Sequence, residues 1–182
     1  MNLGLFFFEI LPLAGFFIGF HYAGLYIAAI ISTFLAGLVM AVSWHREKRL
    51  AMFPLFSLVL SLGLTASALL LEATIFIKIQ PTLFNGIFAT VLLGGLLQGR
   101  PMMKLFFASQ FSLTEQTWYT LSLRWGLFFL TLALANEYVW RNYSDADWVA
   151  FKTVIAAPAS ALFMLVQLPL TLRGRISIQK NL

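Results

Sequence analysis

Residues 22–43 read YAGLYIAAIISTFLAGLVMAVS, a stretch without a charged side chain, and the cluster WHREKR follows at residues 44–49. An α-helix needs roughly 20 mostly apolar residues to cross the hydrocarbon core of a bilayer. The stretch meets that length and ends at basic residues, which is typical of the edge of a membrane span. It therefore predicts a membrane-spanning helix.

Similar apolar runs recur along the chain. They cover residues 3–20, 54–71, 82–98, 123–140 and 149–172. Hydrophobic residues make up 60% of the chain and charged residues only 10%, whereas a soluble domain carries about 25% charged residues. Too few polar side chains remain to hydrate a globular surface. The sequence predicts an all-α polytopic membrane bundle, with residues 1–182 forming a single integral-membrane domain.

The first run, residues 3–20, differs from the others because it contains Glu9 and Pro12. A proline inside a helix leaves backbone groups that need another partner. Two arrangements remain open: a tilted or broken span, and a re-entrant segment packed against its neighbours. The prediction is therefore five transmembrane helices plus an N-terminal broken or re-entrant segment, or six spans in all.

Lys and Arg residues gather in alternate gaps between the runs. Three lie after the second run (Arg46, Lys48 and Arg49), three after the fourth (Arg100, Lys104 and Arg124), and three close the chain (Arg173, Arg175 and Lys180). The intervening gaps hold Lys78, and then Arg141 with Lys152. Loops rich in Lys and Arg stay in the cytoplasm. We therefore expect these basic gaps and the tail, residues 173–182, to be cytoplasmic.

Residues 100–123 mix polar and apolar side chains in the fourth gap. A segment that lies along the headgroup layer with its apolar side inserted would have this composition. We predict an interfacial amphipathic cytoplasmic segment here. Thr114 and Glu115 are typical of a helix start.

Three polar residues fall within the predicted runs: Glu9, Asn85 and Asn136. Such groups are costly in hydrocarbon and are candidates for function by default, as a proton or cation site or as the lining of a path. The ordinary alternatives are a hydrogen-bonded carboxyl at Glu9, an interhelical hydrogen bond at Asn85, and satisfaction by water or a neighbouring helix at Asn136.

Two pairs of glycines, Gly15 with Gly19 and Gly95 with Gly99, have the spacing that lets helix backbones approach closely. We expect these glycines to pack within the chain rather than to form a dimer.

The sequence offers no signature of an enzyme. It contains neither a phosphate-binding GxxxxGK[ST] motif nor an HExxH motif. Cysteine is absent, and Asp145 and Asp147 occupy a position where helix-start acids are expected. We predict no catalytic residues, no metal site and no cofactor. Nucleic-acid binding is not expected either, because the basic residues lie beside apolar runs.

A set of local strings runs in order over nearly the whole chain. They are Leu11-Pro12-Leu13 with Phe16-Phe17; Phe76-Ile77-Lys78 with Pro81-Thr82; Gly99-Arg100-Pro101; Trp118, Leu121, Arg124-Trp125, Phe128-Phe129 and Asn136; and Trp148-Val149 with Phe151-Lys152. With these residues the chain resembles the bacterial intracellular septation protein A family of inner membrane-spanning proteins. The resemblance implies a bacterial inner-membrane protein with a role in envelope biogenesis, envelope integrity and septation. It also implies contact with cell-elongation and division proteins, and it brings no enzyme activity or cofactor.

Cations beside tryptophans at both headgroup layers suit contact with anionic lipids. The leading hypothesis is a non-enzymatic membrane scaffold that binds membrane lipids or partner helices. The candidate contacts are Lys78, Arg100, Lys104, Trp118, Arg124, Trp125, Trp148 and Lys152. The alternative is a small transporter or lipid flippase in which Glu9, Asn85 and Asn136 line a polar path.

Overall fold

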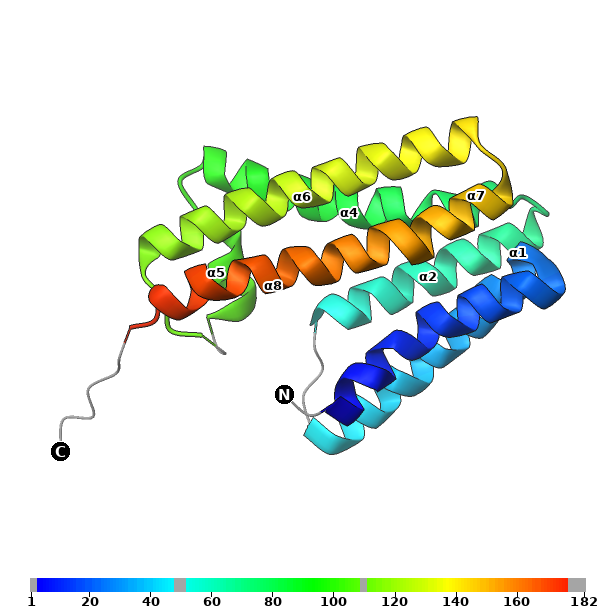
Figure 1. Cartoon of the computed structure of the whole chain (residues 1–182), viewed down its shortest axis with the longest axis horizontal. Helices are drawn as coiled ribbons and strands as arrows, with labels where there is room; N and C mark the ends of the chain where they lie inside the picture. Colours follow the sequence, from blue (N-terminus) through cyan, green and yellow to red (C-terminus); the bar gives the residue numbers. More distant parts are fainter. Residues whose placement is uncertain (1–2, 48–51, 109–110, 177–182) are drawn as a thin grey trace.

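The structure, a computed structural model, describes residues 3–47, 52–108 and 111–176, with side chains from residue 10 onward except at residues 47 and 52–54. These residues form α-helices that run back and forth along one long axis (Figure 1). The predicted all-α membrane bundle is confirmed, because the described helices are long, apolar and joined by short turns.

In chain order, the described helices are α1 (Leu3–Glu47), α2 (Met52–Leu70), α3 (Ile75–Lys78), α4 (Gln80–Leu97), α5 (Met102–Phe107), α6 (Glu115–Asn142), α7 (Asp145–Ala150), the π-helical turn η1 (Phe151–Ala156) and α8 (Ala157–Arg173). The long helices alternate in direction, while α3 runs on into α4, and α7 and η1 run on into α8 (Figure 1). Among the described residues, four helical stretches are long and apolar enough to cross a membrane: Ile10–Arg46, Ile75–Leu97, Glu115–Asn142 and Asp145–Arg173. A shorter apolar helix covers Leu55–Leu70.

α1 is a hairpin of two helical arms rather than one straight rod (Figure 1). The chain reverses at Gly24, whose φ of 78° and ψ of −175° favour glycine. A Cβ atom at Gly19 would lie 3.0 Å from Cα of Ala28, so the two arms approach closely there. The first glycine pair thus packs within the chain, as predicted. Pro12 lies inside the first arm, and the helix continues through it.

α4 and α6 form the most extensive helix pair of the bundle. Their approach depends on Gly126, where a Cβ atom would lie 2.7 Å from Cδ2 of Leu93. Aromatic rings extend the contact, with the centroids of Phe88 and Phe129 5.8 Å apart. This helix pair runs between the two ends of the bundle and connects them (Figure 1).

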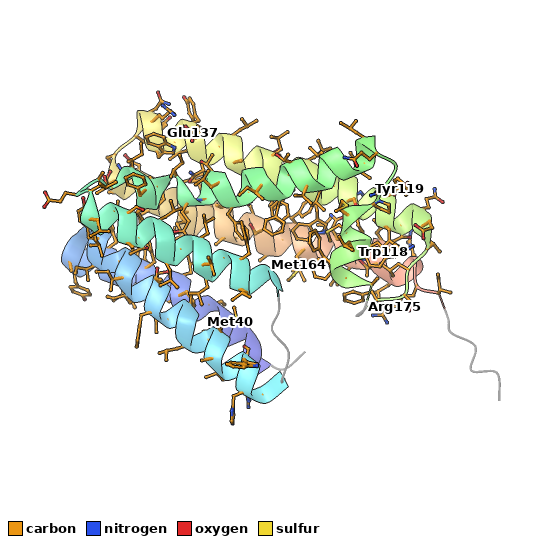
Figure 2. All side chains as sticks on the ribbon, turned by 180° about the vertical axis from the view of Figure 1, so that it is seen from behind. Met40, Trp118, Tyr119, Glu137, Met164 and Arg175 are labelled. Carbon is orange, nitrogen blue, oxygen red and sulfur yellow. The ribbon has the colours of Figure 1, made fainter. Side chains whose placement is uncertain are left out.

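The two ends of the bundle differ in charge. The ends of α1, α4 and α8 lie at the end where the described chain begins, together with α5 and the start of α6 (Figure 1). We call this the basic end; its described cations are Arg46, Arg100, Lys104, Arg124, Arg173 and Arg175. The opposite end holds Gly24, the α2–α3 turn and the α6–α7 turn. Figure 2 shows Glu137 at this opposite end, far from Trp118, Tyr119 and Arg175.

Candidate functional site

Asn136 lies near the end of α6 and is almost completely buried, with 2% of its surface exposed. Its Nδ2 donates hydrogen bonds to the carbonyl oxygen of Lys78 at 2.9 Å and to the hydroxyl of Thr82 at 2.8 Å. Its Oδ1 accepts a hydrogen bond from the indole Nε1 of Trp148 at 3.0 Å. One amide group therefore ties α6 to α3, α4 and α7.

Glu137 extends this arrangement toward the surface. Its Oε2 accepts hydrogen bonds from the hydroxyl of Thr82 at 3.1 Å and the indole of Trp140 at 2.9 Å. Its Oε1 accepts a hydrogen bond from Nε of Arg141 at 2.6 Å. Because Thr82 accepts from Asn136 and donates to Glu137, the bonds form one connected network. The residues Lys78, Thr82, Asn136, Glu137 and Trp148 are called the Asn136 cluster below.

The start of α7 directs Trp148 into this cluster. The hydroxyl of Ser144 accepts a hydrogen bond from the backbone N–H of Asp147 at 3.2 Å, and the Asp147 carboxylate accepts one from the Ser144 N–H at 3.3 Å. This capping box fixes the first turn of the helix. The prediction that Asp145 and Asp147 are helix-start acids is confirmed.

An ion pair between Lys78 and Asp145 also joins α3 to α7. The side chain of Lys78 is 16% exposed and that of Asp145 is 45% exposed. Ion pairs open to water contribute about 0–1 kcal/mol. A buried group left without its hydrogen-bond partner costs about 1–3 kcal/mol. The amide of Asn136 therefore matters more to this end than the ion pair does.

Lys152 lies beside the cluster, one helical turn beyond Trp148. Its Nζ is 3.8 Å from the ring centroid of Phe16 and 5.3 Å from the ring of Trp148. Phe16 belongs to the first arm of α1, so this contact connects the hairpin to η1. The structure thus brings together Lys78, Asn136, Trp148 and Lys152, which the sequence had only suggested one by one.

A second cluster lies at the basic end. Trp118 is 2% exposed and packs with Leu113 and Leu121. Arg124 reaches α8, where its guanidinium donates a hydrogen bond to Oε1 of Gln167 at 3.2 Å. Trp125 is half-buried, with its ring edge-on to Phe163 at a centroid distance of 4.9 Å. These contacts join α6 to α8.

The other two cations predicted for this end lie at its surface. Arg100 is exposed after the last turn of α4, which Gly99 ends with a φ of 70°. Gly99 therefore ends the helix, and the hydroxyl of Tyr119 in α6 donates a hydrogen bond to its carbonyl, so it packs within the chain. Lys104 in α5 forms an exposed ion pair with Glu115. Residues 100–123 contain α5, a connection and the first turns of α6; their position at the membrane interface stays a prediction.

The chain after α8 returns to the start of α6. The N–H of Thr114 donates to the carbonyl of Gly174 at 3.0 Å, and the N–H of Ile176 donates to the carbonyl of Ser112 at 2.9 Å. Thr114 is also the N-cap of α6, which confirms the predicted helix start. This pairing fixes the end of the described chain to the basic end.

A protein-family model for intracellular septation protein A matches residues 5–176, which include both clusters. The chain belongs to this family. It is 40% identical over 144 residues to the inner membrane-spanning protein YciB of Brucella melitensis, covering 79% of this chain and 72% of that protein. It is 42% identical over 142 residues to YciB of Sinorhizobium medicae, covering 78% of this chain and 67% of that protein. No solved structure matches the chain.

Membership of the septation protein A family, the names of these relatives and the apolar helices together give a multi-pass inner-membrane location. Among the residues whose side chains are described, no group of three His, Asp or Glu residues could hold a metal ion.

The sequence offered an alternative in which Glu9, Asn85 and Asn136 line a polar path. The described part of the structure does not contain such a path. Asn136 is closed by its three hydrogen bonds, and Asn85 donates to the carbonyl of Pro81 in its own helix at 2.8 Å. The side chain of Glu9 lies outside the described residues. A groove of about 490 Å³ lies instead between α1 and α2, and neither asparagine lines it.

Two residues of the candidate contact set face inward. Trp118 and Trp148 are 2% and 0% exposed, so neither ring is a surface contact in this structure, contrary to expectation. The sequence reading also overlooked Thr82 and Phe16 as site residues and left Glu137 without a partner. Their partners lie on other helices, and a single sequence carries no signal for such pairings.

Proposed function

We propose that this septation protein A family member is a non-enzymatic scaffold of the bacterial inner membrane. Its role would be in envelope biogenesis, envelope integrity and septation, through contacts with lipids or partner helices, including those of cell-elongation and division proteins. The observation that supports this proposal is a difference between the buried polar groups and the cations at the basic end. At depth, Asn136 bonds to residues of other helices, while the described cations at the basic end are exposed.

The basic end faces the cytoplasm in this proposal. The gaps that supply its cations hold most of the Lys and Arg of the chain, whereas the other end has Lys78, Arg141 and Lys152. An excess of Lys and Arg keeps short loops in the cytoplasm. The C-terminus is then cytoplasmic, and the Asn136 cluster lies toward the outer face of the membrane.

The contact surface at the basic end consists of cations next to apolar side chains. Arg100 and Arg124 are exposed. Leu105 and Phe106, which lie on the short helix α5 between them in sequence, are exposed large hydrophobic residues. A cation near the surface of an anionic leaflet contributes roughly 1 kcal/mol to binding. Two such cations beside inserted apolar groups suit anionic lipids or the acidic end of a partner helix.

The test is complementation of a strain that lacks its chromosomal copy. The double variant R100Q/R124Q is expected to insert normally but to protect cells poorly against envelope stress, because the outward-facing charges are gone. Growth in low-osmolarity medium, detergent sensitivity and cell length are the measurements. A fluorescent-protein fusion confirms that the amount in the membrane is unchanged.

The matched control is K104Q/R141Q, which also removes two positive charges. Both of these cations are in ion pairs with Glu115 and Glu137, so the control is expected to behave like the wild type. Full protection by R100Q/R124Q would refute the proposed contact surface, and equal failure of both variants would show an effect of net charge alone.

A further inference from the structure

The ammonium group of Lys152 lies in a corner made by two aromatic rings. Phe16 and Trp148 meet edge to face, with their centroids 5.9 Å apart and their planes at 74°. The Lys152 Nζ is closer to Phe16, at 3.8 Å from the ring centroid. Aromatic faces attract cations. They do not accept the strong N–H···O hydrogen bonds that an ammonium group with three donors can form.

The described acids at this end of the bundle do not pair with this cation. Asp145 binds Lys78, Glu137 binds Arg141, and Asp147 caps α7. Glu72 is exposed in the α2–α3 turn and forms no ion pair with Lys152. In the part of the chain that the structure describes, neither a carboxylate nor another hydrogen-bond acceptor contacts the Lys152 ammonium. Charged groups inside membrane segments are normally paired or close to water. The Lys152 ammonium therefore requires a partner that the described residues do not supply.

The direction of the side chain indicates where that partner comes from. Lys152 follows Asp145, the first residue of α7, by about 10 Å along the helix axis. Its ammonium nevertheless lies over Trp148, one turn back toward the end of the bundle. A lysine that extends toward the nearer membrane surface keeps its stem in hydrocarbon and its charge at the headgroups. The ammonium therefore points toward the phosphate layer.

The backbone around Lys152 is unusual as well. Residues Phe151–Ala156 form a π-helical turn, which is rare and frequently occurs at functional sites. The hydroxyl of Thr153 donates to the carbonyl of Val149 at 2.8 Å in this turn. The turn interrupts the otherwise regular stretch from α7 to α8. It contains Lys152, whose ammonium lies over the rings of Phe16 and Trp148.

From this geometry we propose that the ammonium group of Lys152, held by the buried rings of Phe16 and Trp148, binds the phosphate group of one anionic phospholipid. The lipid belongs to the leaflet at the Asn136 end, which is the outer leaflet in the orientation given above, and the site rests on the proposed lipid-binding function. A phosphodiester offers only acceptors and a negative charge at the depth that the ammonium reaches. A lipid with a net negative charge is preferred because the Lys152 charge is not already neutralised.

The test is native mass spectrometry of the full chain in detergent with added phosphatidylglycerol or phosphatidylcholine. Wild-type protein is expected to bind one phosphatidylglycerol more tightly than phosphatidylcholine. K152M, which keeps an unbranched apolar side chain, is expected to bind phosphatidylglycerol about tenfold more weakly, the effect of about one charge-assisted hydrogen bond. K152R should retain most of the affinity, and K104M, which removes a cation at the basic end, should leave this tight binding unchanged.

Inorganic phosphate separates a lipid from a soluble anion as the source of the phosphate group. It is expected not to displace the lipid at millimolar concentration; displacement would show a site for soluble anions and overturn the proposal. Unchanged phosphatidylglycerol affinity in K152M would also overturn it, while leaving the scaffold proposal to stand on Arg100 and Arg124. If K152M loses the lipid while R100Q/R124Q protects cells fully, the lipid site stands and the proposed contact surface at the basic end is refuted.

Discussion

The indole of Trp148 donates a hydrogen bond to the side-chain oxygen of Asn136 at 3.0 Å, and both residues are buried. The same amide uses its nitrogen for Lys78 and Thr82. An unpartnered polar group is costly in a place without water. The pairing of Asn136 with Trp148 therefore decides how the end of α6 is joined to the helices around it.

Replacing Asn136 by leucine is expected to lower the free energy of unfolding by about 3 kcal/mol, because the Trp148 indole and the Lys78 carbonyl lose their partner. Unfolding in mixed micelles, followed by tryptophan fluorescence, measures the change. Asn142→Ala is the control, since the Asn142 side chain is exposed and, among the described residues, bonds only to the Tyr138 carbonyl of its own helix. Wild-type stability in N136L would show that the amide network does not hold this end together.

Gly126→Ala is expected to destabilise the protein by about 1–3 kcal/mol, the usual effect of overpacking. The new methyl group would lie 2.7 Å from Cδ2 of Leu93 and would force α4 and α6 apart. Gly86→Ala in α4 meets open space and should stabilise the helix by about 0.5–1 kcal/mol. Thermal unfolding of the two variants under identical conditions compares them, and an equal shift in both would contradict the close approach of α4 and α6.

Gly174→Ala is expected to detach the chain that follows α8. A Cβ atom at Gly174 would lie 2.6 Å from Cγ2 of Thr117, and the hydrogen bond from Thr114 to the Gly174 carbonyl would break. Limited trypsin digestion should then cleave after Arg173 and Arg175 several times faster than in the wild type. Gly37→Ala, which meets open space, should show wild-type cleavage. Identical cleavage rates in G174A and the wild type would refute the proposed pairing.

The sequence predicted the helices well where an apolar run and a cap coincide. Thr114 caps α6, and Asp145 and Asp147 lie in the first turn of α7, as predicted. It placed other boundaries less well, because a helix extends beyond its apolar part. α6 begins at Glu115, so Arg124 lies about two and a half turns inside the helix rather than at its start.

The runs predicted at residues 3–20 and 22–43 put a boundary close to the reversal at Gly24, but the sequence left open whether the first run is broken at Pro12. Pro12 is the stronger helix breaker by intrinsic preference, yet the first arm continues through it. The glycine conformation and the close packing of Gly19 on Ala28 decide where the chain turns. Tertiary packing here outweighs local preference.

The candidate site could be predicted only as separate residues. Lys78, Asn136, Trp148 and Lys152 were all named from the sequence, but nothing in it joined them. Asn136 and Lys78 are 58 positions apart in the chain, and their contact depends on how α4 packs along α6. Burial of Trp118 and Trp148 was missed because tryptophans near span ends usually face the headgroups.

Accessibility of single cysteines tests the central claim, a bundle whose basic end is cytoplasmic and whose Asn136 end is outside. The natural chain has no cysteine, so each introduced thiol is unique. An impermeant maleimide applied to spheroplasts should label Y22C, E72C and S144C, and should label W44C, Q98C and I176C only after permeabilisation. Labelling of the second group in intact spheroplasts would contradict the orientation. Protection of Y22C alone would contradict the placement of the Gly24 reversal at the outer face.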